Sequence, residues 1–157
     1  MSLVTDLNGK QAEAFDLIMR KQFAWDIIEG RKRLEFRDLS NFYMRKFVKN
    51  VKTWDTVELD FIHFRDYGNT WFLDVHIASV DTVALLPENL PYFHEYGHHE
   101  FDEEIAGNEG KQPKDAGYLF CLPVDAIINT NLDDMGKIRA ISRLPIITLS
   151  DLVASDD

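Results

Sequence analysis

The sequence has a single cysteine, Cys121, among its 157 residues, so no disulfide can form within one chain. The run around it, YLFCLPV, is apolar and predicts a buried, unreactive thiol rather than a nucleophile or a metal ligand. No apolar run approaches the roughly 20 residues that a transmembrane helix needs. The opening residues MSLVTDLNGKQAEAF also lack the basic and then apolar order of a signal peptide. We therefore expect a cytoplasmic protein with no membrane partner.

Basic residues are also scarce. The chain has 17 lysines and arginines against 27 aspartates and glutamates, a net charge of −10, which argues against a surface built to coat nucleic acid phosphates. Residues 20–52 are the exception, with ten basic residues against four acidic ones, which leaves seven against 23 for the remainder. This asymmetry predicts a local anion site on an acidic protein. A solvated helix surface with incidental lysines is the alternative that the composition leaves open.

The length and the 45% content of hydrophobic residues predict one domain over residues 1–157, and the sequence has neither internal repeats nor a low-complexity linker. Residues 1–13 are expected to form an N-terminal arm or a short helix, and residues 87–116 a long loop with one short helix. Between them, periodicity predicts the following elements: strand 14–19, helix 22–29, strand 34–37, helix 41–48, a hairpin of 56–64 with 70–80, and strand 117–131. Residues 137–153 could add a strand or an extended arm. These elements predict an α+β fold on a small, mostly antiparallel sheet or barrel with short inserted helices.

A spacing of four residues, G-x-K-x-x-E-x-R, stands out in the basic region. Gly30 would let the chain reverse after the helix, so that Lys32 projects from the turn. Glu35 and Arg37 stand two apart on the next strand and therefore share one face. Two cations and a carboxylate around one point can bind a phosphate or a polarised carbonyl and can accept from a base N–H.

The segment LIMRKQFAWDIIEGRKRLEFRD, which carries this spacing, resembles the opening of an ASCH domain. The resemblance covers residues 15–49 and includes the aromatic and basic run NFYMRKF that follows. It implies a PUA-like β-barrel whose cleft holds RNA or a nucleotide. The ligand-binding residues that it implies are Gly30, Lys32, Glu35 and Arg37, and Tyr43 closes the same segment.

One branch of that family is similar to N4-acetylcytidine amidohydrolases, whose motif is G-R-K-x-x-T-x-R-D. Glu35 stands here in place of the catalytic threonine, so the hydroxyl for acyl chemistry is missing. If the protein is an enzyme, an amidohydrolase for an acylated nucleoside, Lys32 would stabilise the oxyanion and Glu35 would transfer protons. The binding function is favoured over this alternative.

A second motif, His94, Glu95 and His98, fits the zinc-protease pattern H-E-x-x-H. A catalytic zinc needs a third protein ligand, and no histidine follows His99, so a zinc hydrolase is a minor alternative. No metal and no cofactor are therefore assigned, although metal binding at His94, His98 and His99 is left open. A partner-binding function of the acidic stretch 100–109 is a further alternative, and the oligomeric state is left open.

The remaining histidines and tryptophans carry weaker signals. His63 and His76 are expected to be strand residues with ordinary hydrogen bonds. Trp25, Trp54 and Trp71 could stack on a base, but aromatics at these spacings lie more often in a core.

Overall fold

The computed structural model describes residues 1–6 and 8–132, and the chain divides into two compact units. Among the described residues, unit 1 contains residues 1–33, 59–78 and 124–132, whereas unit 2 contains residues 34–58 and 79–123. The strand or arm predicted at residues 137–153 lies outside the described residues. The prediction of a single domain over residues 1–157 stays a prediction.

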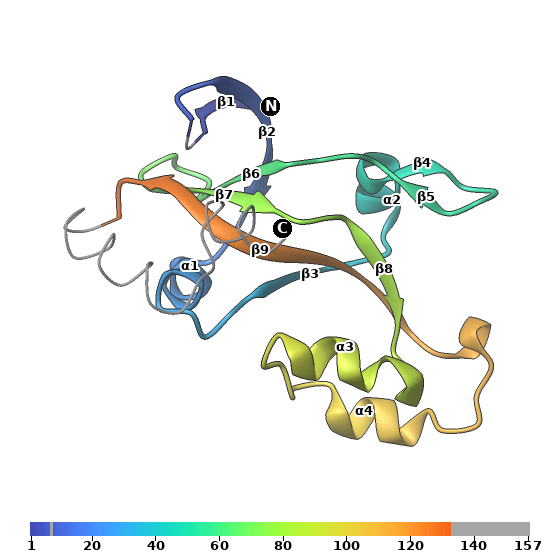
Figure 1. Cartoon of the computed structure of the whole chain (residues 1–157). Coiled ribbons are helices and arrows are strands. Elements are labelled where there is room, and N and C mark those ends of the chain that lie inside the picture. Colours follow the sequence, from blue (N-terminus) through green and yellow to red (C-terminus); the bar gives the residue numbers. More distant parts are fainter. Residues whose placement is uncertain (7, 133–157) are drawn as a thin grey trace, which may run out of the picture. The chain divides into compact units, whose positions relative to one another are not determined.

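Unit 1 is built on a mixed sheet with the strand order β1, β2, β6, β7 and β9, in which β2 and β6 are parallel and the other neighbours antiparallel (Figure 1). Its elements are β1 (Ser2–Thr5), β2 (Gln11–Ile18), α1 (Lys21–Ile28), β6 (Phe61–Arg65), β7 (Phe72–Ile77) and residues 124–130 of β9 (Tyr118–Thr130). The antiparallel pairing of β6 with β7 confirms the predicted hairpin. Asn69 in the connecting turn has a φ of 56°, a left-handed conformation that asparagine tolerates better than most residues.

Helix α1 confirms the helix predicted before the basic region. Ala24, Ile27 and Ile28 are buried on its inner face. Gly30 follows with a φ of 80°, the left-handed conformation that ends a helix most readily at glycine. The chain then reverses direction, and the Lys32 N–H donates to the Asp26 carbonyl oxygen over 3.0 Å.

Residues 1–13, expected to form an arm or a short helix, contain β1, which pairs antiparallel with β2. Val4 of β1 is buried against Ala14 and Phe61. One apolar side chain facing inward is enough to hold this short strand, and such a signal is too brief to appear as a period in the sequence.

Unit 2 combines a three-stranded antiparallel sheet, a small hairpin and several short helices (Figure 1). Its elements are β3 (Leu34–Asp38), α2 (Asn41–Phe47), β4 (Val48–Asn50), β5 (Asp55–Thr56), β8 (Asp81–Ala84), η1 (Pro87–Asn89), α3 (Leu90–Glu95), α4 (Asp102–Gly107), η2 (Pro113–Asp115) and residues 118–123 of β9. Helix α2 matches the predicted helix, and the Ser40 hydroxyl caps it by accepting from the Tyr43 N–H over 3.4 Å.

Strand β9 lies between β3 and β8 in unit 2 and defines two faces of the sheet. Directly opposed residues of antiparallel strands point to the same face. One face carries Arg37, Phe120 and Thr82 in a row across the three strands. The other carries Phe36, Cys121 and Asp81 in the adjacent row.

Helices α3 and α4 belong to the apolar cluster on the Cys121 face. The buried members of this cluster are Leu34, Val83, Leu85, Phe93, Ile105 and Cys121. Residues 87–116 were expected to be a loop with one short helix. They contain two short α-helices and two 3-10 turns. The complete burial of Cys121 agrees with the predicted buried thiol.

The prediction of an α+β fold with a mostly antiparallel sheet is confirmed. The predicted barrel is not formed as a closed structure. Among the described residues, β1 pairs only with β2, and β3 and β8 pair only with β9, so the strands leave open edges. No helix in the described part of the chain is long and apolar enough to cross a membrane.

Two histidine–aspartate pairs lie in the sheet of unit 1. His63 Nδ1 contacts Asp74 Oδ1, and His76 Nδ1 lies 2.6 Å from Asp125 Oδ1. Both aspartates are buried. These contacts match the ordinary hydrogen bonds expected for strand histidines.

Asp74 provides a test of this arrangement through its pKa. Burial raises the pKa of Asp74 above its ordinary value of 3.8, and the His63 hydrogen bond opposes that rise. Because the folded-state pKa is the higher one, the contribution of Asp74 to stability is fully present below the unfolded pKa. It is lost as the pH rises through the folded pKa.

We therefore expect the free energy of unfolding of the wild type to fall relative to that of Asp74→Asn as the pH rises above 3.8, the ordinary pKa of the group. Chemical denaturation of both proteins at each pH measures this difference, in which other titrating groups largely cancel. A difference that is flat or rises with pH would contradict the burial of Asp74.

Candidate functional site

The residues of the G-x-K-x-x-E-x-R signature are distributed over both units. Gly30 and Lys32 belong to unit 1, whereas Glu35, Arg37 and Tyr43 belong to unit 2. In unit 1 the Lys32 ammonium lies 5.5 Å from the centre of the exposed Phe23 ring, in a cation–π contact. The convergence of Lys32 with Glu35 and Arg37, which the resemblance implies, stays a prediction.

Within unit 2 the two remaining signature residues, Glu35 and Arg37, lie together with Tyr43. Arg37 Nε is 3.2 Å from Glu35 Oε1, and the Arg37 guanidinium also donates to the Tyr43 hydroxyl over 2.8 Å. The side chains of Glu35 and Arg37 are only 8% and 14% exposed. The predicted shared face of Glu35 and Arg37 thus agrees with the contacts in this unit, whereas ligand binding by these residues and by Tyr43 stays a prediction.

Arg37 is positioned by aromatic packing. Its guanidinium lies 5.5 Å from the centre of the Tyr43 ring, and Tyr43 stacks on Phe47 with 5.8 Å between ring centres. Phe47 in turn packs against Phe120 of β9. A chain of aromatic contacts therefore positions the charged pair of Arg37 and Glu35 relative to the sheet of unit 2.

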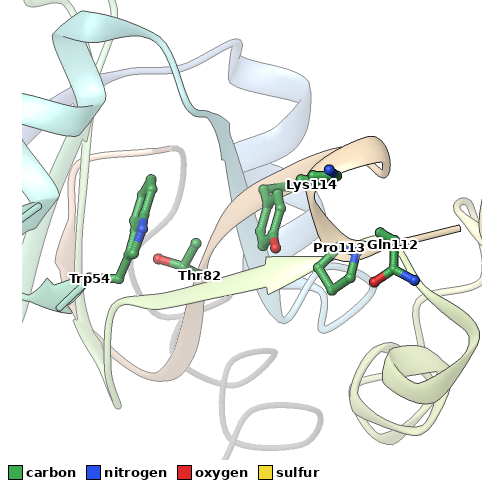
Figure 2. Close-up of a pocket in the computed structure, with 6 residues that line it drawn as sticks. Trp54, Thr82, Gln112, Pro113 and Lys114 are labelled. Carbon is green, nitrogen blue, oxygen red and sulfur yellow. The ribbon is translucent and has the colours of Figure 1, made fainter. Parts of the chain in front are cut away.

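Unit 2 also contains a cavity of about 820 Å³. Its lining residues come from the β4–β5 turn, from β8, from the segment around η2 and from the start of β9: Trp54, Thr82, Gln112, Pro113, Lys114 and Tyr118. Figure 2 shows Trp54 and the η2 residues at opposite sides of the cavity, with Thr82 between them. The volume lies within the range of small-molecule sites.

The strand register places this cavity on the same sheet face as the charged pair. Thr82 and Arg37 are both directly opposite Phe120, one on each side of β9. Two strand spacings amount to about 10 Å between their backbones. The cavity and the Glu35–Arg37 pair are therefore neighbouring parts of one face of unit 2.

Two polar side chains of the cavity, those of Thr82 and Lys114, have no polar partner among the described residues. The buried Thr82 hydroxyl oxygen has no hydrogen-bond partner in the described part of the chain. Lys114 is exposed and forms no ion pair with any described residue. A donor such as Lys114 and a buried hydroxyl can both bind a polar ligand without breaking an existing contact.

Trp54 combines exposure with an unusual backbone conformation. Its φ of 60° is left-handed, which is a clear outlier for a bulky residue. The residue is 46% exposed, and among the described residues its indole pairs with no other aromatic ring. The expectation that Trp54 lies in a core is therefore wrong. Its position in the polar, basic run after Lys49 and Lys52 is the signal that could have indicated an exposed ring.

The H-E-x-x-H geometry predicted for zinc is not formed. Helix α3 ends at Glu95, and Gly97 with a φ of 79° reverses the chain before His98. The buried His98 uses Nε2 to accept from the Leu34 N–H over 3.2 Å, and its Nδ1 contacts Glu100. Because His98 lies beyond the helix and serves the core, it does not share a helix face with His94 as a metalloprotease would require.

Comparisons with known protein families, with characterised proteins and with solved structures found no match. The resemblance to ASCH domains thus depends on the signature and its flanking elements.

The contact between His98 and Leu34 is expected to stabilise the start of β3. His98→Ala removes the acceptor of a buried N–H and leaves a cavity, so the free energy of unfolding should fall by about 2 kcal/mol or more. Urea denaturation measures this loss. The matched control is Glu95→Ala in the same motif, because this exposed side chain should change stability by less than about 0.5 kcal/mol. Equal effects of the two substitutions would contradict a structural role for His98.

Proposed function

We propose that the chain binds a nucleotide, free or as part of single-stranded RNA, in the cavity of unit 2. The observation that carries this proposal is the lining of that cavity. An exposed Trp54 and the partly buried Tyr118 offer flat aromatic surfaces for a nucleobase, and Lys114 offers a cation for phosphate. Gln112 and the Thr82 hydroxyl offer hydrogen bonds to the edge of a base.

The charge around Trp54 supports an anionic ligand. Residues 39–54 contain four basic side chains and no aspartate or glutamate, although the chain as a whole is acidic. These four are Arg45, Lys46, Lys49 and Lys52, and all are exposed. A local basic segment attracts phosphate over short distances, whereas the acidic remainder would repel a long duplex. The ligand class is accordingly a nucleotide or a short single strand.

The resemblance to ASCH domains supports the same assignment. It implies a PUA-like domain with a nucleotide or RNA cleft, and in unit 2 the implied residues Glu35 and Arg37 share a sheet face with the cavity. We propose that they extend the binding surface beyond the base, with Arg37 available to a second phosphate or to a base carbonyl. Binding roles for Gly30 and Lys32 stay predictions, and Tyr43 is proposed as a further binding residue because its hydroxyl accepts from Arg37.

Binding is favoured over the amidohydrolase alternative. Thr82 is the threonine that lines the cavity, so its hydroxyl is the group to consider as a substitute for the missing catalytic threonine. This hydroxyl has no hydrogen-bond partner among the described residues, so no base there activates it as a nucleophile. Glu35 is paired with Arg37, an arrangement suited to fixing a cation.

Trp54→Gly separates binding from folding. Glycine adopts the left-handed conformation at this position without strain, so stability should be unchanged or slightly raised. Affinity for the four ribonucleoside 5′-monophosphates should nevertheless fall about 5- to 150-fold, because base stacking on an aromatic ring is lost. Isothermal titration calorimetry measures affinity, and thermal unfolding measures stability.

The control for this experiment is Phe42→Ala, which removes another exposed aromatic ring of unit 2 that does not line the cavity. Its nucleotide affinity should equal that of the wild type. Unchanged affinity in Trp54→Gly, or no binding of any of the four nucleotides by the wild type, would contradict the proposed site.

Lys114→Ala tests where the phosphate lies. We expect affinity for cytidine 5′-monophosphate to fall about tenfold, because one charge-assisted hydrogen bond is lost, while affinity for cytidine stays the same. The same substitution at Lys111, an exposed lysine outside the cavity lining, should change neither affinity. An equal loss for nucleotide and nucleoside would show that Lys114 does not contact phosphate.

A further inference from the structure

Three potential metal ligands converge in the segment that joins α3 to α4 in unit 2. One ligand atom each from His94, His99 and Asp102 lies within 4.8 Å of the other two. His94 Nε2 is 2.8 Å from Asp102 Oδ1, and His99 Nδ1 is 3.4 Å from Asp102 Oδ2. The two imidazole rings are 4.4 Å apart between centres and 36° from parallel.

We propose that these three residues bind one divalent transition-metal ion, with zinc as the representative ligand. Zinc binds histidine nitrogen and carboxylate oxygen at about 2.0–2.2 Å, so ligand atoms around a tetrahedral ion lie about 3.4 Å apart. No separation in the cluster is above 4.8 Å, so each exceeds this value by at most about 1.4 Å. Imidazole and carboxylate together suit zinc, nickel, copper or ferrous iron rather than calcium or magnesium.

The side chains are free to make this small adjustment. His94, His99 and Asp102 are 39%, 65% and 41% exposed, so rotation of each meets little packing. The same exposure leaves the other coordination positions open to solvent. The site is therefore an exchangeable three-ligand site instead of a closed four-ligand structural one.

Apolar packing holds together the helices that carry the ligands, without an ion. Phe93 of α3 and Phe101, the residue before α4, pack with 5.4 Å between ring centres. Ile105 of α4 lies in the same apolar cluster as Phe93, and both are completely buried. Because apolar packing already brings α3 and α4 together, metal binding does not have to order the chain.

The position of the ligands determines what the ion does. His94 lies in the last turn of α3, and Asp102 is the first residue of α4. A bound ion would link the two helices and stabilise the folded state of unit 2 by mass action. This function is distinct from H-E-x-x-H catalysis, because His99 takes the place of His98 as a ligand and lies beyond the end of α3, so the two histidines do not share a helix face.

Zinc titration of the chelator-treated full chain tests this proposal. Isothermal titration calorimetry should give one zinc ion per chain, and zinc should raise the melting temperature. His99→Ala and Asp102→Asn should each lower zinc affinity at least about tenfold, because removing one of three ligands weakens the chelate. The matched control is Glu103→Gln, which removes one negative charge from the same turn of α4 but no ligand and should leave affinity unchanged.

Histidine ring NMR signals identify the ligands independently of affinity. Zinc should shift the signals of His94 and His99, and leave those of His63 and His76 in unit 1 unchanged. The proposal is overturned if the wild type binds no zinc, if Glu103→Gln weakens binding as much as Asp102→Asn, or if other histidines shift in place of His94 and His99.

Discussion

The pairing of β9 with two neighbours is the constraint on which the site of unit 2 depends. Each β9 side chain between residues 118 and 121 has a directly opposed residue on β8, and from residue 119 one on β3 as well. Phe120 thereby places Arg37 and Thr82 on one face. A slip of β3 by one residue would turn Glu35 and Arg37 toward the apolar cluster with α3 and α4, where two charges would lose their solvation. The register is therefore fixed by burial on both faces.

The sequence was informative wherever a local period decided the structure. Helix α1, the strand with Glu35 and Arg37, and the β6–β7 hairpin follow from spacings of 3.6 or 2 residues and from glycine or asparagine at turns. The division of β9 between the units has a weaker signal. Pro123 lacks a backbone N–H and is the last residue of unit 2, just before β9 pairs with β7 at Val124. A proline within a 13-residue strand thus marks its change of neighbours.

The cavity could not be predicted in the same way, because its residues are far apart in the sequence. Trp54 and Lys114 are separated by 60 residues, and neither lies in a regular strand or in a long helix. Helices α3 and α4 have six residues each, too few for a reliable period, and they are stabilised by the Phe93 and Ile105 packing rather than by their own propensity. Tertiary contacts alone decide that His98 enters the core while its neighbour His99 stays exposed.

Trp54 shows how a cost in folding free energy points to function. A left-handed conformation at a bulky residue costs about 1–3 kcal/mol, and glycine or asparagine would form the same turn with less strain. The indole does not recover this cost by burial, since Trp54 is 46% exposed and pairs with no aromatic ring of the described residues. What the strained turn does achieve is to present a large aromatic surface to the cavity beside a basic segment. The proposed nucleotide, with a flat ring and a phosphate, would use both features, so the backbone outlier and the charge pattern support the same proposal.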